Sequence, residues 1–437
     1  MLNIKTKIDD LTSRQGFMRY FKNTSWLMGE RILRMAVGLF VGIWVARYLG
    51  PEQFGLFSYA QSFVGLFTVI AGLGLDGIVV RELVRDPAKQ AVLLGTAFRL
   101  KIIGALLVIV VLAIAMWLTN QDGLTALLVF IIASATVFQS FNVIDFFFQA
   151  NVLSKYVVFV NMASLFTSSV AKVILILNDA ALTAFAVVVL FDSFVLMFGL
   201  VYFFQKKSKI SFKTLRFSKP VAVDLLRNSW PLILSGVAIS IALRIDQVMI
   251  KNYLDLSHVG LYSSGVRLAE AFLFIPMVVA QSIFPKIIEM DIERGRKFLV
   301  LLVRRVFYVL VVLSIIVNNT SEFVVVSLFG HDFLGGHVVL DVLIWTIPFT
   351  HLGIMTNKLH LKNHEQKTIF IKQLTLTIFN VLLNISLIPV FGLVGAALAT
   401  LLTDIVINLF FDFIVKRNRW IFFLKLEALF FIKVRLS

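Results

Sequence analysis

Apolar runs of about 20 residues recur along the whole chain, and short polar segments separate them. A helix needs a run of about this length to cross the hydrocarbon core of a bilayer. The pattern therefore predicts an all-α integral membrane protein with twelve transmembrane helices. The predicted spans are 25–47, 56–80, 93–118, 124–150, 156–177, 182–204, 226–250, 260–285, 298–317, 338–359, 368–388 and 393–415. Ser321–Phe329, before the tenth span, is also apolar, and we interpret Phe329-Gly-His-Asp-Phe as part of an external loop with a short buried piece.

One polar segment is present in two copies. The first reads RYLGPEQFGLFSY at 47–59, and the second reads NYLDLSHVGLYSS at 252–264. The two align without a gap, with identical Tyr, Leu, Gly, Leu and Ser positions. Gly50-Pro51 predicts a tight turn, because proline lacks an amide donor and glycine is conformationally loose.

The repeat predicts two six-helix bundles of the same orientation, related by a pseudo-twofold axis along the membrane normal. Pairs of this kind enclose a central cavity, which favours a transporter over an enzyme. The predicted divisions are a cytoplasmic amphipathic segment at 1–24, an N-terminal bundle at 25–204, a basic cytoplasmic linker at 205–225, a C-terminal bundle at 226–415 and a basic interfacial tail at 416–437.

Lysine and arginine set the expected orientation. With a cytoplasmic N-terminus, the inner segments hold 28 of these residues and the outer loops hold one, Lys251. Because cytoplasmic loops are enriched in positive charge, both termini are predicted to be cytoplasmic.

Composition agrees with this class: the chain has 437 residues, 59% of them hydrophobic and 15% charged, with a mean hydropathy of +0.92. The net charge of +16 is explained by inner loops that face anionic lipid headgroups, so no nucleic-acid partner is expected. The chain has no cysteine, which excludes disulfides, thiolate metal sites and cysteine nucleophiles.

Ionisable residues inside predicted spans are the candidate functional groups, because such residues are costly and normally face a cavity or a partner. Guanidinium groups bind phosphate in a bidentate way, so the arginines are the candidate substrate contacts. The acids are their charge partners or sites of ion coupling, and purely structural ion pairs are the alternative. Glu30 and Arg34 are spaced to pair, as are Arg267 and Glu270. The substrate candidates are Arg31, Arg34, Arg244 and Arg267, and the acidic candidates are Glu30, Asp76, Asp246 and Glu270.

Several kinds of chemistry lack their sequence signatures. The chain has no G-x-x-x-x-G-K-[ST], no H-E-x-x-H and no G-x-S-x-G, so we expect no catalytic residue, no metal site and no cofactor. Coupling to a proton or sodium gradient is compatible with the deep carboxylates. The largest outer segment, about 318–337, is small for an enzyme that holds a sugar outside the membrane.

The segment at 47–59 resembles the first-loop signature of Wzx-type O-antigen and polysaccharide flippases of the multidrug/oligosaccharidyl-lipid/polysaccharide (MOP) superfamily. Asp246-Gln-Val-Met-Ile, GLYSSGVRLAE at 260–270 and FGHDF at 329–333 are also similar to that family. The likeness runs from about Phe21 to Val415. Where the family usually has an acidic residue after Phe-Gly, this chain has His331.

The resemblance implies two bundles that alternate between inward-open and outward-open states in a bacterial inner membrane. It implies a substrate of undecaprenyl-pyrophosphate carrying an oligosaccharide repeat unit, passed to the periplasmic leaflet for O-antigen, lipopolysaccharide or other surface polysaccharide assembly. Expected partners are that substrate, membrane lipids, and the polysaccharide polymerase and chain-length machinery. The alternatives are an ion-coupled multidrug or organic-cation antiporter of the same fold and, less favoured, a membrane glycan polymerase or ligase.

Overall fold

The computed structural model describes residues 14–208, 210–289 and 292–430, and every regular element within them is helical. The predicted segment 1–24 and tail 416–437 therefore lie partly outside the described residues. The α-helices are α2 (Arg14–Gly72), α3 (Asp76–Arg85), α4 (Gln90–Leu118), α5 (Gly123–Gln139), α6 (Val143–Ala150), α7 (Lys155–Leu177), α8 (Leu182–Lys207), α9 (Lys219–Tyr253), α10 (Leu256–Phe272), α11 (Phe274–Glu289), α12 (Ile292–Phe329), α13 (His337–Leu343), α14 (Thr346–Lys362), α15 (Gln366–Ile414) and α16 (Arg419–Phe430). Short 3₁₀ turns are η1 (Pro87–Lys89), η2 (Ser140–Asn142), η3 (Phe212–Thr214), η4 (His331–Gly336) and η5 (Lys416–Asn418).

Nine helical stretches within the described residues are long and apolar enough to cross a membrane. The number is ten if His331–Leu343 and Thr346–Lys362, which are bent by 46° to each other, form one span. The protein is thus an all-helical, multi-pass membrane protein. The number twelve, the side of the termini and the repeat symmetry stay predictions.

The two longest stretches contain internal breaks. Gln366–Ile414 as one straight helix would be about 74 Å long, more than twice the thickness of a bilayer core. The backbone leaves the helical conformation at Gly392 (φ 58°, ψ −131°). Helix α2 has a similar break at Gly50 (φ 70°, ψ 171°), directly before Pro51. A positive φ is accessible to glycine at little cost, so the turn predicted at Gly50-Pro51 is confirmed as a break in the helix.

One predicted loop is helical instead. Helix α12 continues through Ser321–Phe329, and it ends only where Gly330 adopts a φ of 97°. No glycine or proline interrupts the apolar sequence before that point. The outer segment predicted at about 318–337 is therefore helical as far as Phe329, and most of FGHDF lies after the end of α12.

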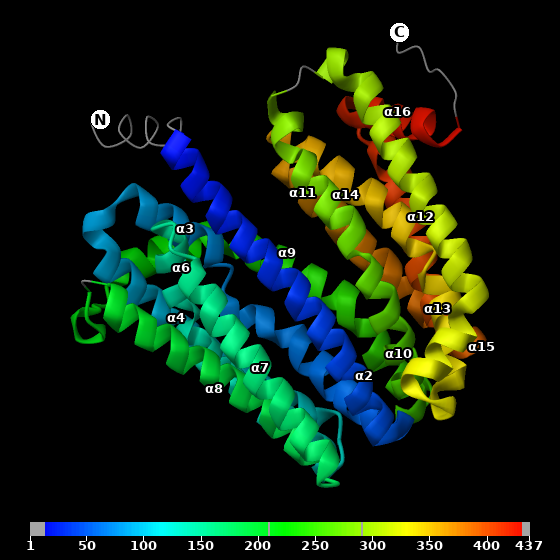
Figure 1. The fold of residues 1–437 in the computed structure, drawn as a ribbon, viewed down its shortest axis with the longest axis horizontal. Helices are drawn as coiled ribbons and strands as arrows, with labels where there is room; N and C mark the ends of the chain where they lie inside the picture. The colour runs from blue at the N-terminus through cyan, green and yellow to red at the C-terminus, as the bar shows by residue number, and fades with distance from the viewer. Residues whose placement is uncertain (1–13, 209, 290–291, 431–437) are drawn as a thin grey trace. The chain divides into compact units, whose positions relative to one another are not determined.

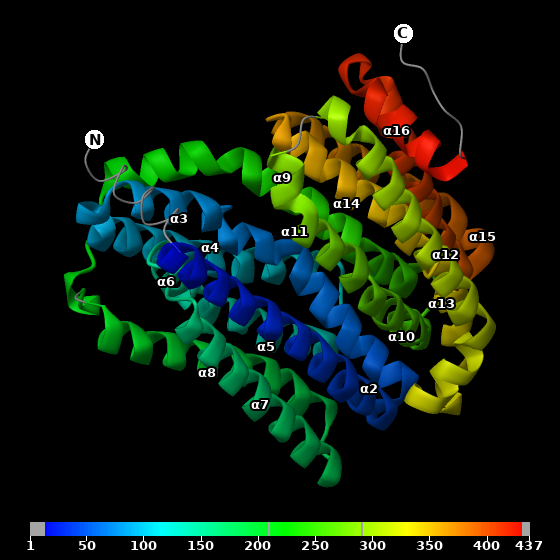
Figure 2. The same cartoon turned by 45° about the horizontal axis from the view of Figure 1, so that its top comes forward.

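The chain forms two compact units, and both are discontinuous in sequence. Unit 1 comprises 1–45 and 63–237, and unit 2 comprises 46–62 and 238–437. In unit 1, α7 and α8 lie side by side in both views (Figures 1 and 2). An apolar core that includes Leu75, Phe148 and Phe204 connects α3, α6 and α8. The predicted bundles at 25–204 and 226–415 stay a prediction.

Unit 2 has its own core, which includes Ala280, Leu352 and Leu424. Helix α16 belongs to this unit, and Ile421, Leu424 and Ala428 on it are buried. Figure 2 shows α16 beside α12, against which it packs. The C-terminal segment is thus integrated into the packing of unit 2 as far as Phe430.

The two copies of the repeated segment pack against each other within unit 2. A Cβ added at Gly55 would overlap the carbonyl oxygen of Leu256, and a Cβ added at Gly260 would overlap that of Pro51. The two contacts are reciprocal, because Pro51 and Leu256 are equivalent positions of the repeat, as are Gly55 and Gly260. Glycine is therefore required in both copies for the close approach of the two backbones.

The second copy ends α9 and begins α10 with a cap. The Asp255 side chain accepts a hydrogen bond from the backbone amide of His258 at 2.8 Å. This aspartate stands where the first copy has Gly50, and Leu256 stands where it has Pro51, so the two copies start their second helices by different means.

Candidate ion and substrate site

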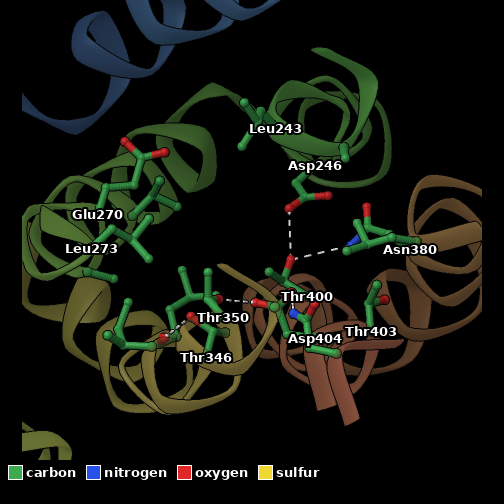
Figure 3. Close-up of a pocket in the computed structure, with 18 of the residues that line it drawn as sticks. Leu243, Asp246, Glu270, Leu273, Thr346, Thr350, Asn380, Thr400, Thr403 and Asp404 are labelled. Carbon is green, nitrogen blue, oxygen red and sulfur yellow. Dashed lines mark hydrogen bonds between the residues drawn. The ribbon is translucent and has the colours of Figure 1, made fainter. Parts of the chain in front are cut away.

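Unit 2 encloses a cavity of about 330 Å³ between α9, α10, α13, α14 and α15 (Figure 3). Apolar residues such as Leu243 and Leu273 form part of its wall. The remainder consists of carboxylates, amides and hydroxyls, which is unusual inside helices that are apolar enough to span a membrane. The polar groups of the wall are Asp246, Gln247, Tyr262, Glu270, Thr346, Thr350, Asn357, Gln373, Asn380, Thr400, Thr403, Asp404 and Asn408.

Asp246 on α9 is the most enclosed acid of the wall, with 7% of its surface exposed. Its carboxylate accepts hydrogen bonds from Tyr262 Oη at 2.8 Å, Asn384 Nδ2 at 2.7 Å and Thr400 Oγ1 at 3.1 Å. Asn384 Nδ2 also donates to Asn380 Oδ1 at 3.1 Å. All three donors to Asp246 are neutral, so they orient the carboxylate without neutralising its charge.

A second acid lies on the opposite wall and has similar surroundings. Asp404 on α15 accepts a hydrogen bond from Thr350 Oγ1 at 2.7 Å and another from Asn408 Nδ2 at 3.1 Å. Figure 3 shows the bond from Thr350, with Glu270 projecting from α10 on the same side of the cavity as Leu273. Three carboxylates therefore contribute to one enclosed volume, and such a site attracts a cation or a proton.

The two candidate arginines of unit 2 do not line this cavity. Arg244 is exposed, and the Arg267 guanidinium lies over the Phe54 ring at 4.7 Å from its centroid. Within the described residues, neither arginine has a carboxylate oxygen within 4.0 Å. The pair of Arg267 with Glu270 that the spacing predicts is therefore not formed, and both cations retain donors for another anion.

The candidates of unit 1 are arranged differently. Arg34 Nε donates to Glu30 Oε1 at 2.7 Å, which confirms the pairing predicted from their spacing. Arg31 on the same helix is exposed. Asp76 lies in the first turn of α3 and accepts from Lys101 Nζ at 3.1 Å. The candidate acids Glu30 and Asp76 of unit 1 are thus paired with cations, whereas Asp246 and Asp404 in the unit 2 cavity are held by neutral donors.

Sequence reasoning missed Lys101 and the neutral partners of Asp246. Lys101 was not singled out, although it is a lysine within an apolar run. Asn380 and Asn384 are spaced four residues apart in an apolar stretch, which places them on one helix face. That spacing was a usable signal for a polar site on α15.

These features define a class: an all-helical, multi-pass membrane protein with a cavity lined by one buried carboxylate, two further acids, and amides and hydroxyls. The family assignment follows from the sequence. The profile of the family described as "Polysaccharide biosynthesis protein" matches residues 20–291, more than half of the chain. The chain belongs to this family.

Individual relatives share limited identity. The chain is 27% identical over 167 residues to "Probable flippase AglR" of Haloferax volcanii, across 36% of this chain and 35% of that protein. It is 25% identical over 277 residues to "Lsg locus putative protein 1" of Haemophilus influenzae, across 61% of this chain and 66% of that protein. The matches thus span about a third and just under two thirds of these relatives.

Solved structures show the same fold. A lipid II flippase MurJ in an inward closed conformation has a TM-score of 0.72 at 16% identity, over 91% of this chain and 89% of that one. An inward-facing multidrug resistance MATE family transporter of the MOP superfamily has a TM-score of 0.70 at 18% identity, over 90% and 95%. Together with the family match, these confirm the resemblance to polysaccharide flippases of the MOP superfamily.

Proposed function

We propose that the protein is a flippase that moves an undecaprenyl-pyrophosphate-linked oligosaccharide from the cytoplasmic to the periplasmic leaflet of a bacterial inner membrane. Membership of the polysaccharide biosynthesis family and the flippase relatives support a lipid-linked saccharide as substrate. The observation in the structure that carries the proposal is the polar cavity of unit 2, because its amides, hydroxyls and carboxylates suit the hydroxyl groups of a sugar.

The arginines have a separate role in this proposal. Arg244 and Arg267 have no carboxylate partner within 4.0 Å among the described residues, so their guanidinium groups are available for a pyrophosphate. Arg31 and Arg34 in unit 1 are the other two proposed contacts. The anionic end of the substrate would then meet arginines outside the cavity, while the carboxylates inside the cavity bind a coupling ion.

Asp246 is the proposed site of that coupling ion, a proton or sodium. Its carboxylate is buried, oriented by three neutral donors, and uncompensated by a nearby cation. A cation that enters this site would replace the missing positive charge. The expected readout is transport that depends on either the sodium concentration or the proton gradient, with Asp246→Asn abolishing this ion-driven transport.

One observation favours a second function. The cavity wall has three carboxylates and none of the candidate arginines, and a cationic drug would also be attracted to such a surface. An ion-coupled organic-cation antiporter is therefore the second candidate. A glycan polymerase or ligase has no comparable support, and we propose a transporter rather than an enzyme.

Deletion of the gene in its host distinguishes these functions. A flippase predicts loss of surface polysaccharide, such as O-antigen, together with lipid-linked repeat units that accumulate on the cytoplasmic side. The polysaccharide polymerase and chain-length machinery are the proposed downstream partners and would lack substrate. Unaltered polysaccharide together with increased drug sensitivity would refute the flippase proposal and favour the antiporter.

A further inference from the structure

A second ionic cluster lies in unit 2, outside the cavity. Its members come from five consecutive pieces of the chain: His360 on α14, Glu365 in the following loop, Asp412 on α15, Arg417 in η5 and Lys425 on α16. His360, Asp412 and Lys425 are fully buried, and Glu365 is 7% exposed. Arg417 is 72% exposed, so it lies at the edge of the cluster.

The histidine lies between two acids. His360 Nδ1 is 2.7 Å from Glu365 Oε2, and His360 Nε2 is 2.8 Å from Asp412 Oδ1. The other oxygen of Asp412 accepts from Lys425 Nζ at 2.5 Å, and Lys425 Nζ also donates to the Asn408 carbonyl at 2.6 Å. The other oxygen of Glu365 faces Arg417 Nη2 at 2.7 Å.

With both acids ionised, this geometry requires that His360 carries a proton on each of its two ring nitrogens. A neutral imidazole has one N–H and one lone pair, so it can donate to only one of two ionised carboxylates. The lone pair would face the other carboxylate oxygen at hydrogen-bond distance, which is repulsive. An imidazolium donates from both nitrogens and satisfies both acids.

The charges of the buried members give the same result. Glu365 and Asp412 contribute two negative charges, and Lys425 contributes one positive charge. The remaining cation, Arg417 beside Glu365, is 72% exposed and therefore screened by solvent, so the four buried groups match in charge among themselves only if His360 is protonated. An uncompensated charge buried in protein is strongly destabilising, whereas a matched set is tolerated.

The cluster joins three helices. Asp412 on α15 contacts both His360 on α14 and Lys425 on α16, so one buried carboxylate links all three. The far end of α16 is held independently by α12, where Arg296 pairs with Glu427 at 2.9 Å and Arg304 donates to the Glu427 and Ala428 carbonyls. His360 acts on the near half of α16 only indirectly, through the Asp412 carboxylate that it shares with Lys425.

We propose that His360, Glu365, Asp412 and Lys425 form a proton-binding latch that holds α16 against α14 and α15. When the imidazolium releases its proton to water, one ring nitrogen presents a lone pair to a carboxylate, and the contact between α14 and its neighbours is lost. The latch is closed in the protonated form and opens as pH rises. It does not depend on the identity of the transported substrate.

Other charged groups surround the latch but do not substitute for the proton. Lys372 on α15 is buried, and its Nζ lies 3.3 Å from Thr356 Oγ1 rather than on a latch carboxylate. Asp404 on α15 is held by Thr350 and Asn408, and Lys286 on α11 lies over the Phe298 ring. Asn408 connects the two sites, because its carbonyl accepts from Lys425 and its side chain donates to Asp404 in the cavity wall.

The protonation state is tested directly by nitrogen NMR of the full chain with labelled histidine. The His360 signal is assigned by its absence in His360→Gln. An imidazolium at pH 7 that becomes neutral only at higher pH supports the latch. A neutral His360 ring at pH 7 would overturn it.

The movement of α16 is tested by thiol labelling, because the chain contains no cysteine of its own. Ile421 is fully buried in the near half of α16, so Ile421→Cys reports opening, and Lys416→Cys on exposed η5 corrects for the pH dependence of the thiol itself. Because losing one partner of a buried ion pair costs about 3 kcal/mol, corrected labelling should rise roughly 100-fold on deprotonation. A corrected rate that does not change with pH would refute the proposal.

Two substitutions in the Ile421→Cys background have opposite expected effects. His360→Gln removes the contacts to both acids, so labelling should be fast at every pH. Glu365→Gln supplies an amide donor to the ring nitrogen, so a neutral imidazole fits and labelling should stay slow even at high pH. His364→Gln is the matched control, because His364 is exposed in the same loop and should keep the wild-type pH profile. Retained pH dependence in Glu365→Gln would contradict the latch.

Discussion

Units 1 and 2 both place acids within membrane-spanning sequence, yet they stabilise them by different means. In unit 1 the acids meet cations, as in Arg34 with Glu30 and Lys101 with Asp76. In unit 2 Asp246 and Asp404 meet amides and hydroxyls. An ion pair is already neutral, whereas an acid held by neutral donors keeps its charge for an incoming ion. The difference separates the charge-compensated Glu30 and Asp76 of unit 1 from the uncompensated Asp246 and Asp404 of the unit 2 cavity, where we propose that a coupling ion binds.

Substitution of Asp246 should have the largest effect. Asp246→Ala leaves three oriented donors without an acceptor, and each buried unpaired donor costs about 1–3 kcal/mol. We expect a clear fall in the melting temperature of the purified protein and no complementation of a deletion strain. Asp246→Asn preserves shape and accepts some of these bonds, so it should fold but fail to transport.

Asp145 in unit 1 provides the control for Asp246. Its carboxylate also accepts from an amide, Gln149 Nε2, at 2.9 Å, but it is outside the unit 2 cavity. Asp145→Asn should retain most activity. Equal loss of transport in Asp145→Asn and Asp246→Asn would contradict the special role given to unit 2.

Substitution of Lys101 should have an intermediate effect. Lys101→Met keeps an apolar stem near the Phe146 ring, over which the ammonium now lies at 4.7 Å, and removes the charge that faces Asp76. Asp76 is 71% exposed, so water can solvate it after the change. We expect a loss of about 1 kcal/mol or less, measured as a small decrease in melting temperature. Lys89→Met, which breaks the exposed pair with Asp86, is the matched control and should change less.

Local sequence was sufficient for some of these features and not for others. The break at Gly50-Pro51 and the Glu30–Arg34 pair were predictable because each depends on residues within one helical turn. The partners of Asp246 were not, because Asn384 and Thr400 are separated from it by 138 and 154 residues. Asn384 and Thr400 become hydrogen-bond donors to Asp246 only because the fold packs their helix against α9.

The same limit explains the C-terminal segment. Its basic and aromatic residues indicated an interfacial tail, and composition alone does not reveal that Lys425 is buried against Asp412. The predicted span that ends at 317 is also too short, because nothing in the sequence stops the helix before Phe329. Tertiary pairing therefore decides the burial of Lys425, and local sequence decides the length of this helix.

Substitution of Arg34 should have the smallest effect on stability and is therefore the sharpest test of a substrate contact. The Arg34 side chain is 38% exposed, and an exposed pair spaced four residues apart contributes only about 0.3–0.5 kcal/mol. Arg34→Ala should leave the melting temperature almost unchanged, so any loss of complementation reports something other than folding. We expect that loss if Arg34 contacts the pyrophosphate. Glu30→Gln is the control, because it removes the same ion pair but keeps the guanidinium. Full complementation by both Arg31→Ala and Arg34→Ala would remove these arginines from the substrate path and leave unit 1 with a structural role only.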